Sequence, residues 1–110
     1  MAQCKITVIE RSFRQDYVEQ YVEAERKKTL GSCEVFTVGQ TFVVDAASSM
    51  PQGFCPWAWN DIYKVLVGYY ANGSFVMWTQ GGNTIIAYCT DGTRPVNFKI
   101  EKIEKYAHFR

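Results

Sequence analysis

The chain has 110 residues, of which 47% are hydrophobic, 21% are charged and 15% are aromatic. This length suits a single domain spanning 1–110, and the apolar content at a net charge of +1 excludes an intrinsically disordered chain. The small net charge also disfavours binding to nucleic acid, which takes a marked basic excess. The sequence contains no apolar run long enough for a membrane-spanning helix and no pattern of a signal peptide. We therefore expect a cytoplasmic, soluble domain without membrane contact.

Charged residues gather at the two ends of the chain. Residues 33–92 hold only five charged side chains, yet they contain all three Trp, most of the Phe and Tyr, and three of the four Cys. A charge-poor aromatic centre is typical of a core wrapped by solvated ends. Part of this centre is expected to form the core or a subunit interface, or alternatively to line a ligand pocket.

The first two elements are predicted from periodicity. Over 3–11 the residues alternate, with Cys4, Ile6 and Val8 on one face, which indicates a strand. Apolar residues then recur at helical spacing, which predicts an amphipathic helix over 15–28. Residues 34–45 form two short apolar pieces, and the second of them predicts a strand.

The central segment, 56–71, predicts a helix that starts at a proline and is apolar around most of its circumference. Such a helix is largely buried, and in a chain this short one side of it is expected to pack against another subunit. This predicts a homo-oligomer or a protein partner. Trp57 and Trp59 are two residues apart and point to different faces, so we expect one in the core and the other at an interface or ligand.

The last part of the chain predicts a β-hairpin. Residues 84–89 and 96–103 read as two strands around Asp91-Gly92, a strong turn signal, and 75–78 as a short strand before them. The order of elements predicts an α+β fold, a small and mostly antiparallel sheet with two helices.

Three motifs resemble those of a family of small prokaryotic proteins of unknown activity, and the resemblance extends over nearly the whole chain. They are C-E-V-F at 33–36, G-F-C-x-W-A-W-x-D-I-Y at 53–63, and C-T-D-G-x-R-P-V-x-F-K-I at 89–100. The resemblance implies no activity, but it places Cys33, Cys55 and Cys89 within the family pattern and leaves Cys4 outside it. The chain departs from the family at Glu34, where many relatives have Pro, so no fixed turn geometry follows at Cys33.

The cysteines leave several alternatives open, since no C-x-x-C motif is present. Cys33, Cys55 and Cys89 are buried apolar side chains, or redox-active or ligand-binding thiols, or the ligands of a zinc or iron–sulfur site. In the last case Asp61 or Asp91 is the candidate fourth ligand. Cys55 precedes the helix at 56–71, where the positive end of the helix dipole favours a thiolate.

Asp61 and Asp91 have two interpretations each. Asp61 either pairs with Lys64 along the helix or directs its carboxylate into a pocket near Trp57. Asp91 either stabilises its own turn or, through Arg94, belongs to an anion site.

These residues favour a small cytoplasmic binding or accessory protein that forms a homo-oligomer. The alternative is a thiol-dependent redox or metal protein that uses Cys33, Cys55 and Cys89. An enzyme with a Cys55 nucleophile has no evident base partner in the sequence, so whether the chain is an enzyme stays open.

Overall fold

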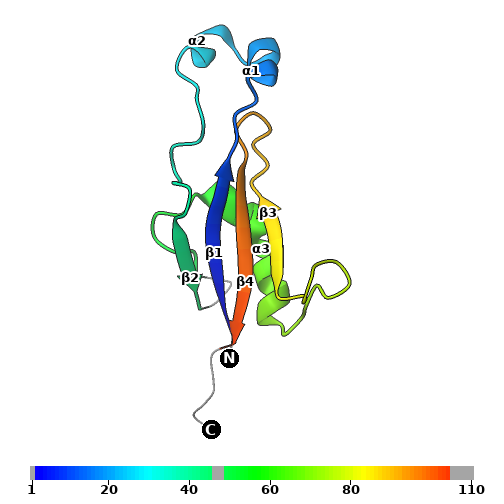
Figure 1. Cartoon of the computed structure of the whole chain (residues 1–110). Coiled ribbons are helices and arrows are strands. Elements are labelled where there is room, and N and C mark those ends of the chain that lie inside the picture. Colours follow the sequence, from blue (N-terminus) through cyan, green and yellow to red (C-terminus); the bar gives the residue numbers. More distant parts are fainter. Residues whose placement is uncertain (1, 46–48, 105–110) are drawn as a thin grey trace.

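The computed structural model describes residues 2–45 and 49–104. The elements in chain order are β1 (Ala2–Arg11), α1 (Gln15–Tyr21), α2 (Ala24–Lys27), β2 (Thr41–Val44), α3 (Pro56–Tyr70), β3 (Thr84–Tyr88) and β4 (Val96–Glu104). The four strands form one antiparallel sheet in the order β2-β1-β4-β3. Figure 1 shows α3 lying across one face of this sheet, with α1 and α2 beyond one end of it. The predicted small α+β fold with a mostly antiparallel sheet is confirmed.

The core lies between the sheet and α3, and the alternation of the strands fills it. The inward-facing side chains of β1 and β4 have no exposed surface, and they are Cys4, Ile6 and Val8 on β1 and Val96, Phe98 and Ile100 on β4. The hairpin register pairs Ile85 with Ile100 and Ala87 with Phe98. Ile85 and Ala87 of β3 therefore lie on the same face of the sheet as the buried residues of β1 and β4. Burial of β-branched and aromatic side chains on one face of a pleated sheet is the main stabilisation of such a layer.

Helix α3 buries one face against the sheet and exposes the other. Its buried residues recur at helical spacing, and they are Ala58, Ile62, Val65, Leu66 and Tyr69. On the opposite side Trp57, Tyr63 and Val67 are exposed apolar or aromatic side chains. One side of α3 therefore packs in the core, and a second apolar side is exposed to solvent in the single chain.

The predicted helix over 15–28 is interrupted, because Val22 and Glu23 have extended backbones between α1 and α2. The side chain of Glu23 accepts a hydrogen bond from the backbone N–H of Arg26 at 3.0 Å, so Glu23 begins a new helix rather than continuing the first. Val18 is buried but lies outside the main core cluster. The first helical segment is therefore a local unit rather than a cover for the sheet.

One predicted strand, 75–78, takes another conformation, whereas the strand predicted in the second apolar piece of 34–45 is β2. Residues 34–38 form an irregular connection, and 75–78 form turns in which the backbone N–H of Trp78 donates to the carbonyl of Phe75 at 2.8 Å. Phe75 packs on Tyr69 of α3, with ring centroids 5.2 Å apart. This packing holds the loop on the helix instead of in the sheet. No helix of the described residues is long and apolar enough to cross a membrane.

Candidate functional site

A cluster of aromatic rings fixes the two connections that carry Cys33 and Cys55. Phe36 and Phe54 lie with their ring centroids 5.0 Å apart, and both contact Phe98 of β4, at 5.2 and 5.7 Å. Edge-to-face and offset contacts at these distances add to the burial energy of the rings. Because Phe36 follows Cys33 by three residues and Phe54 precedes Cys55, the rings hold both cysteines beside the core.

Cys33 is held further by an arginine at the end of β1. One Nη of Arg11 donates to the carbonyl of Cys33 at 2.8 Å and to the carbonyl of Phe36 at 3.2 Å. A charged donor shared by two carbonyls ties this irregular connection to the sheet. Cys33 is half-buried.

Cys55 is the N-cap residue of α3 and is half-buried. Its backbone is extended and its carbonyl accepts the first helical hydrogen bond, from the N–H of Trp59 at 2.9 Å. Its thiol makes no capping hydrogen bond to the first turn. The predicted position of Cys55 at a helix N-terminus, directly before Pro56, is confirmed.

Cys89 follows β3 and is 7% exposed. Its N–H donates to the carbonyl of Val96 at 3.1 Å, and its sulfur accepts from the N–H of Val96 at 3.4 Å. These contacts close the hairpin end, and they fix Cys89 more firmly than the other two cysteines.

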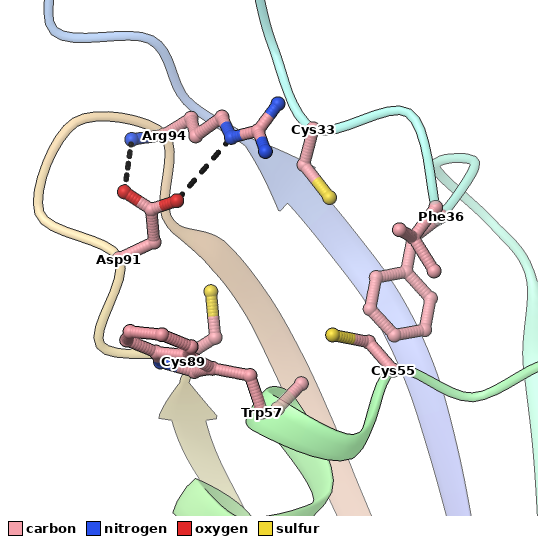
Figure 2. Close-up of a pocket in the computed structure, with 9 residues that line it drawn as sticks. Cys33, Phe36, Cys55, Trp57, Cys89, Asp91 and Arg94 are labelled. Atoms are coloured by element: carbon pink, nitrogen blue, oxygen red, sulfur yellow. Dashed lines mark hydrogen bonds and ion pairs between the residues drawn. The ribbon is translucent and has the colours of Figure 1, made fainter.

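The three cysteines, which come from three separate parts of the chain, line one cavity of about 130 Å³. Figure 2 shows their sulfur atoms around this space, with Trp57 below and Arg94 above. The other lining residues are Val35, Phe36, Ala58 and Asp91. The cavity thus contains six of the seven site residues predicted from the sequence, Cys33, Cys55, Cys89, Trp57, Asp91 and Arg94.

Asp91 performs the turn function that its sequence position predicts. One carboxylate oxygen accepts from the N–H and hydroxyl of Thr93 at 3.1 and 2.9 Å, and the other accepts from Nε of Arg94 at 3.2 Å. Partial burial raises the pKa of Asp91, but these hydrogen bonds outweigh it and bring the pKa below its usual value. Asp91 is therefore an ionised turn residue at neutral pH that holds Arg94 at the cavity rim.

Asp61 lies outside the cysteine cavity. Its carboxylate accepts from the backbone N–H of Thr90 at 2.7 Å and from the Thr90 hydroxyl at 3.0 Å. The Thr90 hydroxyl in turn accepts from Nε1 of Trp57 at 2.9 Å. The predicted pair with Lys64 is absent among the described residues. Asp61 instead connects α3 to the residue that follows Cys89, in a shallow depression lined also by Trp57, Asn60 and Thr90.

The two tryptophans differ as predicted. Trp59 packs against the core ring of Phe54, with centroids 5.5 Å apart. Trp57 is 61% exposed and lines the cavity. Trp59 therefore contributes to the stability of the core, and Trp57 contributes to the site.

Cys4 belongs to the core, as its face of the first strand predicts. Its side chain is fully buried, and burial raises the pKa of its thiol, partly offset by Tyr70 and Lys102. A buried thiol with a raised pKa is inert, so Cys4 is an internal reference for the reactivity of the other three.

The arrangement does not fit the zinc or iron–sulfur site that the sequence left open. Among residues 2–45 and 49–104, no three Cys, His, Asp or Glu side chains lie close enough together to hold a metal ion. The sulfurs surround a cavity rather than a point, and the two candidate fourth ligands, Asp61 and Asp91, are engaged by Thr90 and by the turn.

Thr90 and Arg11 contribute to the site although neither was predicted as a site residue; Thr90 lies within the motif at 89–100, and Arg11 has no sequence signal. Both act on backbone or side-chain groups far away in the chain, and such pairings follow from the fold rather than from local spacing. Comparison with protein-family models, curated proteins and solved structures finds no match to this chain. The resemblance to a family of small prokaryotic proteins stays a prediction.

Proposed function

We propose that the chain is a small cytoplasmic binding protein whose ligand site is the cavity lined by Cys33, Cys55 and Cys89. The observation that carries this proposal is the convergence of three thiols from three segments on one hollow. Cys4, by contrast, is fully buried in the core and does not line this cavity. Trp57 supplies an aromatic wall and Arg94 a charged rim, which is the mixture of apolar lining and few polar groups typical of ligand sites.

The size of the cavity limits the ligand. A volume of 130 Å³ is well below the range of about 300–1,000 Å³ for drug-sized ligands. Such a space suits a few water molecules or a compound with a handful of non-hydrogen atoms. The proposal is therefore a site for a small compound and not for a nucleotide or a peptide.

Alkylation with iodoacetamide, followed by peptide mass spectrometry, tests this proposal. Cys55 and Cys33 are half-buried and are expected to react in the native protein, whereas Cys4 is expected to react only after unfolding. Filling the cavity through Ala58→Leu is expected to protect Cys55. Val67→Leu, on the exposed side of the same helix, is the matched control. Reaction of Cys4 as fast as Cys55 would remove the basis for the proposal.

The uncovered apolar surface supports the proposed homo-oligomer. β3 is an edge strand without a charged residue, and Ile86 and Tyr88 on it are exposed. The neighbouring loop exposes Met77 and Trp78, at 98% and 78%. An uncharged edge strand can pair with its own copy about a two-fold axis, because antiparallel pairing is self-complementary.

Light scattering is expected to give a mass that rises with concentration, and Ile86→Lys is expected to hold the chain as a monomer. A monomeric mass for the unmodified chain at all concentrations would refute self-association.

A thiol-dependent redox protein is the second candidate, favoured by the same three free cysteines. Two thiols would lose two protons and two electrons to hydrogen peroxide, which becomes two water molecules, and form one disulfide. Peptide mapping after peroxide treatment is expected to find a pair within Cys33, Cys55 and Cys89. Recovery of three unlinked cysteines would leave binding as the function of the site.

A further inference from the structure

The two charged side chains of the cysteine cavity differ in how many of their hydrogen-bonding groups have a partner in the protein. Asp91 and Arg94 are the charged residues that line it. Both carboxylate oxygens of Asp91 accept hydrogen bonds, from Thr93 and from the backbone and Nε of Arg94. Asp91 is thereby turned toward its own loop and is not a free acceptor for a ligand.

Arg94 retains donors. Its Nε is taken by Asp91, and within the described residues neither of its Nη groups has a protein acceptor. The side chain is 28% exposed, so these groups are partly shielded from water. Figure 2 shows the end of the guanidinium directed toward the side of the cavity that holds Cys33. An arginine with two free Nη groups at a cavity rim suits a carboxylate or another planar anion.

The first turn of α3 forms the wall of the cavity opposite Arg94. Trp57 and Ala58 follow the N-terminal proline of the helix, and both line the cavity. Their backbone N–H groups belong to the first turn, which lacks acceptors within the helix, and Cys55 supplies no side-chain cap. The positive end of the helix dipole therefore borders the same space that the free Nη groups of Arg94 border.

We propose that the cavity binds a small anion that also carries a thiol-reactive carbon, with the anionic group between Arg94 and the start of α3 and the reactive carbon at the sulfur of Cys55. This inference rests on the proposed ligand site and names its ligand class. In the reaction the Cys55 thiolate sulfur forms a bond to the electrophilic carbon. The leaving group departs with the bonding electrons, and the thiol proton passes to solvent. The two sets of donors hold the negative charge, so the electrophile is oriented before it reacts.

Two reagents of nearly equal size separate this inference from simple accessibility. Iodoacetate is anionic and iodoacetamide is neutral, and both transfer a two-carbon group with loss of iodide. The rate of each at Cys55 is measured by peptide mass spectrometry and divided by its rate on the unfolded chain. We expect the normalised rate of iodoacetate to exceed that of iodoacetamide by about fivefold, which corresponds to about 1 kcal/mol.

Substitutions of Arg94 identify the source of the preference. Arg94→Gln is expected to lower the iodoacetate rate several-fold more than the iodoacetamide rate, and Arg94→Lys is expected to restore part of the preference. Lys64→Gln makes the same change of charge at an exposed position of α3 outside the cavity, and is expected to have no effect. Arg94→Gln keeps the hydrogen bonds that Thr93 makes to Asp91, so the turn is expected to fold.

A competition measurement on the unmodified chain gives an independent result. Sodium acetate is expected to slow the reaction of Cys55 with iodoacetamide, and acetamide at the same concentration is not. Equal normalised rates for the two reagents, or an equal loss of both in Arg94→Gln, would overturn the anion inference alone. If neither reagent modifies Cys55 faster than buried Cys4, the ligand site itself is overturned.

Discussion

Replacing Asp61 by Ala tests whether this carboxylate fixes the residue that follows Cys89. The change removes two hydrogen bonds, to the N–H of Thr90 at 2.7 Å and to its hydroxyl at 3.0 Å. Hydrogen bonds to a charged acceptor contribute about 1.5–3 kcal/mol, and solvent at this exposed position reduces that. We expect a loss of about 1–2 kcal/mol in the free energy of unfolding, or about 5–10 °C in Tm for a domain of this size.

The measurement is urea unfolding followed by circular dichroism, combined with the alkylation rate of Cys89. Because Cys89 is 7% exposed and adjoins Thr90, release of Thr90 is expected to raise that rate while Cys4 stays protected. Lys64→Ala, on the exposed side of the same helix, controls for helix propensity and is expected to have little effect.

A double-mutant cycle with Thr90→Val isolates the interaction. The valine keeps the backbone N–H. It loses the hydroxyl, which donates to Asp61 and accepts from Nε1 of Trp57. Contacting residues show coupling energies of about 0.5–3 kcal/mol, and we expect a value near the lower end because one bond to Asp61 survives. Additive losses within about 0.3 kcal/mol, together with an unchanged Cys89 rate, would refute the role assigned to Asp61.

Two further predictions concern stability. Gly81 and Gly82 share a φ of +76°, but a Cβ on Gly82 would lie 2.8 Å from the backbone of Val76, whereas nothing lies within 4 Å of one on Gly81. Thermal unfolding is therefore expected to show a loss of about 1 kcal/mol for Gly81→Ala and about 2–4 kcal/mol for Gly82→Ala, and equal losses would contradict the packing. The lowered pKa of Asp91 means that its ionised form stabilises the fold above the usual pKa of 3.8 and that this stabilisation is lost as the pH falls below it. Asp91→Asn is expected to cost about 1 kcal/mol at pH 7 and to match the unmodified chain near pH 2, as urea titrations at both values would show.

The strands and the central helix were predictable because their signals are local. Cys4, Ile6 and Val8 alternate with polar side chains, and the sheet buries that face of β1. Residues 56–71 begin with a proline and recur at helical spacing, and α3 spans Pro56–Tyr70. The Asp91-Gly92 signal marks the connection between β3 and β4. In each case the residues that specify the element are those that form it.

The departures arise where a side chain competes with the periodic pattern. Helical spacing over 15–28 continues through Glu23, but its carboxylate caps α2 and interrupts the helix. At 75–78 the apolar run suggests a strand, yet Phe75 packs onto Tyr69 and the chain turns. A single hydrogen bond or ring contact decides between two conformations of similar intrinsic preference, and periodicity does not report it.

The convergence of Cys33, Cys55 and Cys89 could not follow from spacing, because each is positioned by a partner distant in sequence. Arg11 holds the carbonyl of Cys33 across 22 residues, and Thr90, next to Cys89, is held by Asp61 across 29. The motifs of the resembled family contain the cysteines and Asp61 but not Arg11. The sequence therefore identified the residues of the site, while their arrangement depends on contacts that only the folded chain provides.

The position of the cavity follows from how the chain enters and leaves the sheet. Figure 1 shows that β3 ends and α3 begins near the same end of the sheet, where the connection from α2 also returns. Aromatic side chains fill the core at that end, and two cysteines lie close to them in the chain, Cys55 directly after Phe54 and Cys33 three residues before Phe36. The hollow at this end is lined by the three cysteines together with Phe36 and Trp57. The same packing that stabilises the fold at this end therefore creates the site.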